Sequence, residues 1–402
     1  MVTKSQRPDD RDLRYSETDR ALAAALDDLL GSRAAPADVI ARTEKQESYD
    51  LGLWATVAAE IGIAGLLIPE ALGGAGGSYT ELAAAAERFG AAAAPIPYLG
   101  SAVVATAVLL RVAKDAAAGS GTAPVSPAAG LLRSMAQGSL TAVLAVEATT
   151  APGAPLPATA RVVGRGDAAR GTVALSATIP AVPDALPAGV LLVPADGVPG
   201  GLYLVEATAP GVHRTPVTSL DMTRQLCDVS LDGAPARQVA LGAAAEAAVA
   251  AGLMAGAAVL AAEQLGLAQR CLELTVAYVR ERRQFNRPIG SYQGLKHRLA
   301  DLWTANTLAA AASRYAAACL AADDLDTPVA VALAKSACCD AAVAAAQECV
   351  QMHGGIGFSW EHPAHLYLKR AKAASVLLGT PGAHRARLAT LANLPAPGAV
   401  SD

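Results

Sequence analysis

Aromatic residues are scarce in this 402-residue sequence, which has 3 Trp, 9 Tyr and 3 Phe, or 4% in all. Charged residues are also few, at 17%, whereas 53% of the residues are hydrophobic and Ala is common among them. A core with few large rings and much alanine favours closely packed helices. The composition therefore predicts a mainly helical protein that can bury a large core and divide into two or three lobes.

Long basic clusters are also missing. No run of Lys and Arg is long enough to follow a phosphate backbone, and the formal net charge is −4, so we expect no nucleic-acid partner. The first ten residues are polar and lack the apolar core of a signal peptide. The most membrane-like run, 247–262, has 262 − 247 + 1 = 16 residues, mostly Ala and Gly, whereas a span needs roughly 20 strongly apolar residues. We expect a cytoplasmic protein without a membrane partner, in which this run is a buried helix.

Metal-ligand patterns are absent as well. The six cysteines show no paired spacing, and five of them lie in helical patterns, which favours reduced thiols in the core over a metal site or disulfides. Glu361, His362 and His365 match no zinc motif. We therefore expect no metal. The cysteines are Cys227, Cys271, Cys319, Cys338, Cys339 and Cys349.

The hydrophobic pattern changes twice along the chain. Apolar residues at three- and four-residue spacing predict helices at 18–30, 51–61 and 79–89. Residues 115–129 have the composition of a linker or irregular loop. Short strand-like runs between Pro, Gly and Asp turns occupy 140–241, and long helical patterns follow from 243 to 391.

This order predicts an α+β fold that is mainly α. It would have an N-terminal helical domain with a linker at 1–129, a small middle β-domain at 130–242 and a C-terminal four-helix bundle at 243–402. In the first domain, Pro69 and four glycines break the helices within 66–78. Ser78 can then cap the next helix, with Glu81 completing a capping box.

Two segments in the last third can carry chemistry. Arg280, Arg282 and Arg283 close a long apolar helix just before a Pro/Gly turn, where cations complement the helix dipole without any ligand. Residues 351–358 place three glycines in four positions after another helix. Such glycines can simply end the helix, or they can let backbone amides approach a phosphate. Each segment alone is a weak signal.

Together, and in this order of lobes, the two segments resemble the acyl-CoA dehydrogenase family. Residues 66–78 with the following helix resemble its N-terminal signature, 266–270 resemble the start of its long C-terminal helix, and 282–293 resemble its Arg-x-x-Phe-Gly segment. The resemblance covers about residues 51–388, strongly in both helical lobes and weakly in the middle. It implies the fold of that family, an acyl-CoA substrate and bound FAD.

The resemblance also implies an FAD-binding surface. Arg282 would pair with the pyrophosphate, a role that suits a permanently charged, bidentate guanidinium. Gln284 and Phe285 would flank it, and Gln293 would lie near the adenine. In the family this surface serves the FAD of a neighbouring subunit, so a shared FAD and an oligomer are expected. Backbone and amide contacts to the adenosine half would come from Gln351, Met352, Gly354 and Gly355.

Two departures concern the reaction itself. Family chemistry removes an α-proton with a carboxylate while the β-hydride moves to the flavin. Alignment places Leu378 at one of the two family positions for this base and Gly256 at the other, and neither can accept a proton. Ala257 also replaces the Arg that usually follows the second position. No catalytic residue is therefore assigned in this chain. A milder departure is Asn286, where the family commonly has Gly, because Asn tolerates left-handed backbone.

The expected flavin cradle in the middle lobe is altered too. Residues 146–153 read Val-Glu-Ala-Thr-Thr-Ala-Pro-Gly in place of a Thr-Glu-Pro-like segment, and Trp54, Trp303 and Trp360 all lie outside this lobe. An intact adenosine surface without base or cradle resembles the second subunit of actinobacterial heterotetrameric acyl-CoA dehydrogenases. The expected partners are a homologous subunit that carries the base and an electron-transfer flavoprotein that accepts the electrons.

Two other hypotheses stay open at this point. The chain could be a self-sufficient flavoenzyme with an unusual base, for which Glu147 and His384 are the candidates. It could also be a non-enzymatic scaffold that has lost FAD. The acyl group is not determined by any residue of the sequence.

Overall fold

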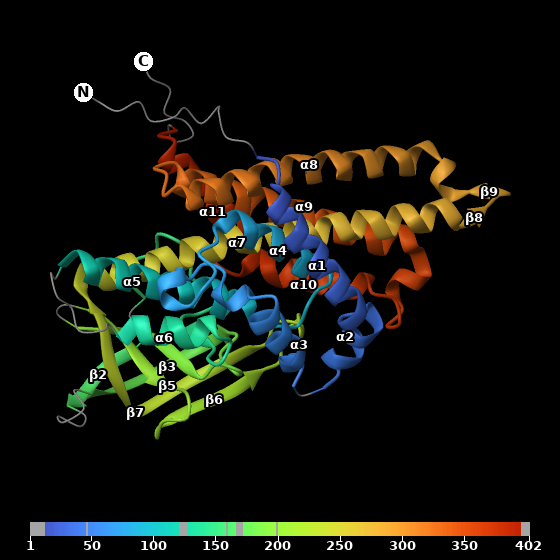
Figure 1. Ribbon diagram of the computed structural model, residues 1–402. Coiled ribbons are helices and arrows are strands. Elements are labelled where there is room, and N and C mark those ends of the chain that lie inside the picture. Colours follow the sequence, from blue (N-terminus) through green and yellow to red (C-terminus); the bar gives the residue numbers. More distant parts are fainter. Residues whose placement is uncertain are drawn as a thin grey trace, which may run out of the picture.

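The computed structural model describes residues 13–45, 47–119, 127–157, 160–165, 172–197 and 200–394. Helices from the two ends of the chain pack together above a β-domain formed by the middle of the chain (Figure 1). The prediction of an α+β fold that is mainly α, with a helical lobe, a β-lobe and a helical bundle in that order, is confirmed.

The N-terminal lobe begins with the predicted helix at 18–30, and the helix predicted at 79–89 is also present. Ser78 and Glu81 form the predicted capping box, with the Ser78 N–H donating to the Glu81 carboxylate at 3.0 Å. The helix predicted at 51–61 is divided into an α-helix and a π-helical turn. The helices are α1 (Glu17–Arg33), α2 (Pro36–Thr43), α3 (Leu51–Ala55), η2 (Thr56–Glu60), η3 (Ile63–Gly65), η4 (Glu70–Leu72), α4 (Tyr79–Ala91), η5 (Leu99–Ala105), α5 (Thr106–Gly119) and α6 (Pro127–Ala136).

The linker predicted at 115–129 is wrong at both ends. Helix α5 continues to Gly119, since the run of alanines after Asp115 has high helix propensity. Helix α6 begins at Pro127, because proline suits the first turn of a helix. Residues 120–126 lie outside the described residues. The predicted boundary between 129 and 130 falls inside α6, and the division into domains stays a prediction.

The middle lobe has strands β1 (Ala142–Leu144), β2 (Ala160–Arg165), β3 (Thr172–Pro183), β4 (Val190–Asp196), β5 (Gly201–Glu206), β6 (Val212–Val217) and β7 (Leu226–Leu241). Pairing runs from β4 through β2, β3, β7 and β5 back to β4, with β1 and β6 added at the sides. Such closure leaves few free strand edges. The lobe has its own core, which includes Leu175, Val205 and Val229.

The C-terminal lobe is built on α7 (Gly242–Glu281), α8 (Gln293–Ala321) and α9 (Thr327–His353), with α10 (Ala364–Val376) and α11 (Pro381–Leu391) beside them. Glycines let α7 pack closely on α4: a Cβ at Gly266 would collide with the Glu87 carbonyl, and a Cβ at Gly90 with the Glu263 carbonyl. Alanine and glycine therefore bring these helices closer than large side chains would allow.

Two helical stretches are long and apolar enough to cross a membrane, namely α7 and residues 327–358. In their most apolar windows, 61% and 67% of the residues are buried inside the protein. These stretches form the centre of the bundle, and the run 247–262 is the buried helix that was predicted. All six cysteines are buried and free, as expected for core thiols.

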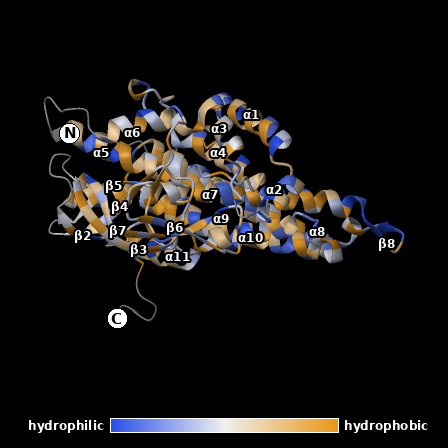
Figure 2. Ribbon diagram, turned by 90° about the horizontal axis from the view of Figure 1, so that it is seen from below, coloured by the Kyte–Doolittle hydropathy of each residue, from blue (hydrophilic) through white to orange (hydrophobic). Residues whose placement is uncertain are grey.

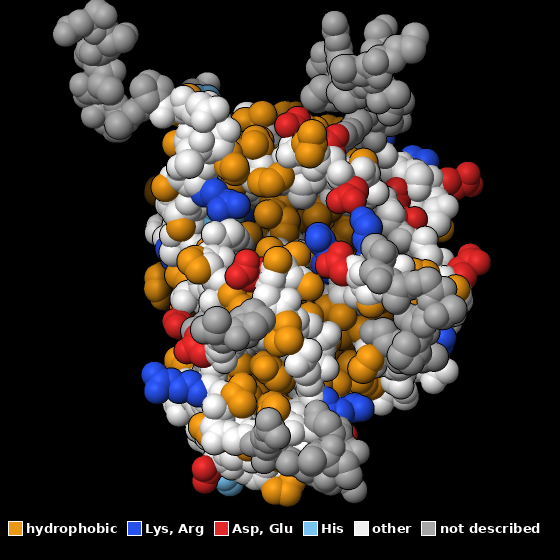
Figure 3. Space-filling model, turned by 90° about the vertical axis from the view of Figure 1, so that its left-hand side faces the viewer, with side chains coloured by type: hydrophobic (Ala, Val, Ile, Leu, Met, Phe, Trp, Pro, Cys, Tyr) orange, Lys and Arg blue, Asp and Glu red, His pale blue; other side chains and the backbone are white. Residues whose placement is uncertain are grey.

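Apolar side chains also reach the surface. At the end of the molecule that carries α5 and β2, they gather in a hollow among charged side chains (Figure 3). Large exposed apolar side chains also occur in the two segments predicted to bind FAD, among them Phe285, Ile356 and Phe358. Apolar surface is thus exposed in more than one part of the molecule.

Candidate functional site

A short hairpin carries the first of the two predicted FAD-binding segments. It consists of β8 (Arg283–Gln284) and β9 (Arg287–Pro288), followed by the turn η7 (Ile289–Ser291). Phe285 and Asn286 form its two-residue loop with φ of 49° and 67°, the left-handed backbone that such tight hairpins need. The Phe285 side chain is 89% exposed. The loop thus holds an aromatic ring out in solvent at the tip of the hairpin.

A small hydrophobic core joins this hairpin to the second segment. Val279 at the end of α7, Ile289 after the hairpin and Met352 at the end of α9 pack together, with Tyr292 and Leu295 beside them. Met352 is 7% exposed, so only its backbone is left for the predicted contact with FAD. The fold thereby brings together two segments that lie about 70 residues apart in the sequence.

The polar groups predicted to bind FAD lie in solvent around this core. Arg282, Gln284, Gln293 and Gln351 are all exposed. Gly354 begins the turn η8 (Gly354–Phe358) with φ of 61°, which favours glycine. Apart from the adjoining residues, no atom of the described residues lies within 4 Å of a Cβ placed on Gly354 or Gly355, so a ligand can approach the backbone there. One guanidinium, three amides and open backbone groups fit the pyrophosphate and adenosine of FAD.

His353 fixes the end of α9 next to these glycines. Its ring stacks on Tyr278 with 4.4 Å between centroids, and its Nδ1–H donates to the Cys349 carbonyl at 2.7 Å. Burial opposes protonation of His353, but its hydrogen bonds to the side chain and backbone of Cys349 raise the pKa above the usual value. The contacts of His353 connect α7 and α9 and hold the glycine turn in place.

The two positions aligned with the family base lie against each other. A Cβ on Gly256 in α7 would be 2.9 Å from Leu378 Cδ1 and 2.7 Å from Val104 Cγ2. Leu378 is 5% exposed and has φ of 57°. Its N–H donates to the Ala148 carbonyl at 2.8 Å. The space at these positions is closed and apolar, and neither residue offers a proton acceptor on its side chain.

This packing predicts that a carboxylate cannot simply be restored. Gly256→Glu would force apart Val104 and Leu378 and would bury a carboxyl group without a partner. We expect the free energy of unfolding to fall by about 2–3 kcal/mol, measured by urea denaturation. Ala250→Glu, at an exposed position on the same helix, is the control and should change stability by less than about 0.5 kcal/mol. Equal stability of the two variants would contradict the packing.

The loop after β1 is also closed by the C-terminal helices. Besides the bond between Leu378 and Ala148, a Cβ on Gly379 would be 2.8 Å from the Ala151 Cβ. The Arg387 guanidinium covers Gly153 so closely that a Cβ there would collide with it. These contacts fill the space beside Ala151 and Gly153, whereas Ala148 of the same loop borders a cavity of about 270 Å³ with Leu377.

The alternative bases lie in unsuitable surroundings. Glu147 is exposed and accepts a hydrogen bond from Thr149 at 2.8 Å. His384 is 3% exposed, and its Nε2–H donates to the Leu378 carbonyl at 2.9 Å, while burial lowers its pKa. The other ring nitrogen of His384 is buried and has no hydrogen-bond partner among the residues that the structure describes. Within the described residues, no group of three or more His, Cys, Asp or Glu side chains gathers to hold a metal ion.

Sequence reasoning missed a buried polar network at the meeting point of the three lobes. Glu263 in α7 accepts hydrogen bonds from Arg224 at 2.6 Å, from Arg370 at 3.0 Å and from the Tyr98 hydroxyl. Arg370 also donates to the Thr223 hydroxyl at 2.6 Å. Burial opposes ionisation of Glu263, but Arg224 and Arg370 lower its pKa to about 2. The sequence did contain one signal of this network, because Glu263 and Arg370 are charged residues within helical segments that are otherwise largely apolar.

The hairpin and the closed base positions are far apart within one chain. Gly256 and Glu281 are 281 − 256 = 25 residues apart along α7, which is about 38 Å at 1.5 Å per residue. The hairpin projects from one end of the bundle, and the β-domain lies toward the other end in both views (Figures 1 and 2). In Figure 2 the hairpin has hydrophilic colours, in contrast to the apolar helices behind it.

Comparisons with known proteins agree on one family. The acyl-CoA dehydrogenase N-terminal domain matches residues 16–118, and the acyl-CoA dehydrogenase C-terminal domain matches residues 246–391. Acyl-CoA dehydrogenase IpdE2 of Mycobacterium tuberculosis is 34% identical over 353 residues, which cover 88% of this chain and 90% of the relative.

Two solved structures are similar as well. The Tcur3481-Tcur3483 steroid ACAD variant has a TM-score of 0.78 and 30% identity, over 94% of this chain and 98% of the other. The ChsE4-ChsE5 complex from Mycobacterium tuberculosis has a TM-score of 0.81 and 27% identity, over 96% of this chain and 100% of the other.

Proposed function

The chain belongs to the acyl-CoA dehydrogenase family of flavoprotein oxidoreductases, and from that premise we propose that it is a non-catalytic partner subunit within that family. It would complete the FAD site of a homologous subunit, and that subunit would supply the base. The assembly would introduce an α,β double bond into an acyl-CoA thioester. The observation that carries the proposal is the packing of Leu378 against Gly256, because it leaves no carboxylate and no space at the two base positions.

The residues of this chain would act by binding. The Arg282 guanidinium would neutralise the pyrophosphate, and the exposed amides of Gln284, Gln293 and Gln351 would hydrogen-bond to the adenosine half. Gly354 and Gly355 would let the backbone lie against the ligand. FAD, when bound, accepts the hydride that leaves the β-carbon.

Distance supports the sharing of one cofactor between two chains. Along α7, about 38 Å separate the hairpin from Gly256, so a dinucleotide held at the hairpin cannot reach the middle of its own bundle. The flavin ring would therefore lie on the neighbouring subunit. The 89% exposed ring of Phe285 provides an apolar contact at the tip of the hairpin, where a neighbour would bind.

The similar proteins support a proposal for the neighbour and for the substrate. Two similar solved structures are described by paired names, and one of them is called a steroid ACAD. We therefore extend the proposal to a heterotetramer with a homologous subunit that acts on the CoA ester of a steroid-derived acid. A cytoplasmic location and an electron-transfer flavoprotein as acceptor complete the proposal.

Flavin retention tests this assignment. The chain would be purified alone and after co-expression with candidate homologous subunits, and the visible absorption of flavin would be measured for each preparation. We expect little flavin in the lone chain and stoichiometric flavin in the right complex. A lone chain that retains one FAD per subunit through gel filtration would overturn the proposal.

A further inference from the structure

The outward face of α8 exposes two large apolar side chains to solvent. Helix α8 runs along one edge of the molecule (Figure 1). On its outward face, Trp303 is 63% exposed and Leu308 is 67% exposed. Four small residues on the same face are exposed as well. Together these six residues form the α8 face, which consists of Ala300, Trp303, Thr304, Thr307, Leu308 and Ala311.

The α8 face is apolar although it includes two threonines. The Thr304 hydroxyl donates to the Ala300 carbonyl at 3.0 Å, and the Thr307 hydroxyl donates to the Trp303 carbonyl at 2.8 Å. Both hydroxyls are thus satisfied within the helix. Asp301 is the only charged residue of this stretch, and its position in the helix places it at the edge of the face, about 90° from the centre. An exposed apolar surface of this kind marks an interaction site.

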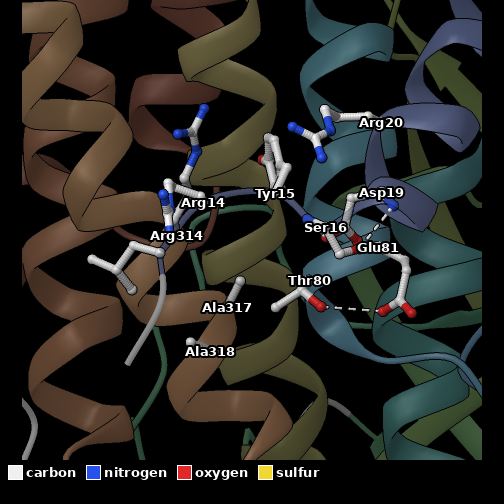
Figure 4. A pocket seen from close by; sticks show the side chains of 11 residues that line it. Arg14, Tyr15, Ser16, Asp19, Arg20, Thr80, Glu81, Arg314, Ala317 and Ala318 are labelled. Carbon is white, nitrogen blue, oxygen red and sulfur yellow. Dashed lines mark hydrogen bonds between the residues drawn. The ribbon is translucent and has the colours of Figure 1, made fainter. Parts of the chain in front are cut away.

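The last turns of α8 are covered by another part of the chain. The Arg314 guanidinium stacks over the Tyr15 ring at 4.4 Å. Residues of α8 from Arg314 to Ala318 line a pocket together with Tyr15 and Ser16 from the segment before α1 (Figure 4). The open part of α8 therefore ends before Arg314.

The α8 face is symmetric about the point between residues 305 and 306. At about 100° per residue, its two alanines lie within about 10° of the centre line of the face, its two threonines about 30° from that line, and its two large residues about 70° from it. The two members of each pair lie on opposite sides of the line and at equal distances from the central point. The pairs are Ala300 with Ala311, Trp303 with Leu308, and Thr304 with Thr307.

A face with this symmetry fits a second copy of itself. In a two-fold interface, residue i of one copy contacts residue j of the other, and j contacts i. Two antiparallel α8 helices would thus place Trp303 of each copy against Leu308 of the other. The small residues along the centre line let the two helices approach closely.

The size of the α8 face suits such a dimer. One Trp, one Leu and four small side chains can bury on the order of 500 Å² on each copy, or roughly 1,000 Å² in all, which reaches the size that a specific interface needs.

We propose that the α8 face joins two copies of this chain in a symmetric, antiparallel dimer. The face includes none of the residues predicted to bind FAD, and the dimer does not depend on the assignment as a partner subunit. In the proposed heterotetramer this contact connects the two copies of the chain. Flavin retention and self-association are separate measurements, so either proposal can fail without the other.

Analytical ultracentrifugation of the full chain, purified alone, tests the dimer. We expect a dimer at micromolar concentration. Leu308→Asp should raise the dissociation constant of the dimer about 100-fold or more, because the symmetry places two carboxylates in an apolar interface. Leu51→Asp is the matched control, since Leu51 is 52% exposed at the start of α3, and it should leave the dissociation constant within about twofold.

Circular dichroism of both variants would verify that the fold is kept. A chain that stays monomeric alone and associates only with a homologous subunit would overturn the proposal, as would a Leu308→Asp variant that dimerises as well as Leu51→Asp.

Cysteine cross-linking tests the register of the two helices. Ala300 and Ala311 are 311 − 300 = 11 residues apart, or about 16 Å along α8, so cysteines at both positions cannot join within one chain. In the proposed dimer, position 300 of one copy faces position 311 of the other. Oxidation by oxygen with copper phenanthroline should therefore link Ala300→Cys/Ala311→Cys into a covalent dimer.

Either single cysteine variant should remain without a cross-link, because its two new thiols would be about 16 Å apart across the two-fold axis. The six natural cysteines are buried and do not compete. No cross-link in the double variant, or equal cross-linking of either single variant, would contradict the proposed pairing.

Discussion

Glu263→Gln is expected to lower the free energy of unfolding by about 3–5 kcal/mol, because removing one partner of a buried ion pair leaves the other charges uncompensated. Glu263 is fully buried and is the shared acceptor of Arg224 and Arg370. Glutamine keeps the size of the side chain, but it leaves two buried guanidinium groups beside a neutral amide. Urea denaturation followed by circular dichroism would measure the change.

Glu246→Gln provides the control, since Glu246 is exposed on the same helix, and it should shift stability by less than about 0.5 kcal/mol. A Glu263→Gln variant as stable as this control would show that the network does not hold the lobes together.

The same network predicts a pH dependence of stability. The folded-state pKa of Glu263 is lowered to about 2, whereas an unfolded Glu has a pKa of about 4.3. The contribution of ionised Glu263 to the free energy of unfolding is therefore fully present above about pH 4.3, and it is lost as the pH falls toward 2. The stability difference between the unaltered chain and Glu263→Gln should shrink over this interval. A difference that stays constant would contradict ionised Glu263 in the folded protein.

Arg282→Ala in this chain is expected to weaken FAD binding by the complex about 10- to 150-fold, since a charge-assisted phosphate contact contributes about 1.5–3 kcal/mol. Stability of the chain should not change, because Arg282 is exposed. Fluorescence titration of the apo-complex with FAD would give the dissociation constant.

Arg280→Ala removes an exposed arginine from the preceding turn of α7 and is the matched control for Arg282→Ala. It should leave FAD affinity within about twofold of the unaltered complex. If Arg280→Ala and Arg282→Ala weakened FAD equally, general positive charge rather than a contact from Arg282 would explain the binding.

The sequence predicted local features well, for physical reasons. Ser78 and Glu81 lie three residues apart, so a short segment of the sequence is enough to predict the capping box. Asn286 was expected to tolerate left-handed backbone, and the hairpin uses that backbone at this position. The order of the lobes was predicted from the spacing of apolar residues, which changes from a helical to a strand-like pattern and back. In each case the residues that decide the structure are neighbours in the sequence.

Features that depend on distant residues were not predicted. Leu378 and Gly256 were identified separately by alignment, but their direct packing joins residues 378 − 256 = 122 positions apart. Tyr98, Arg224, Glu263 and Arg370 come from all three lobes, so no sequence pattern links them. The ends of the expected linker at 115–129 were wrong because alanine propensity and an N-terminal proline outweighed the overall composition.

Turnover by the lone chain tests the central claim most directly. The purified chain would be saturated with FAD and given a steroid-derived acyl-CoA together with an artificial electron acceptor, and acceptor reduction would be followed by absorbance. With Leu378 and Gly256 at the base positions, the account predicts no acyl-CoA-dependent reduction until the homologous subunit is added. Full turnover by the lone chain would contradict it.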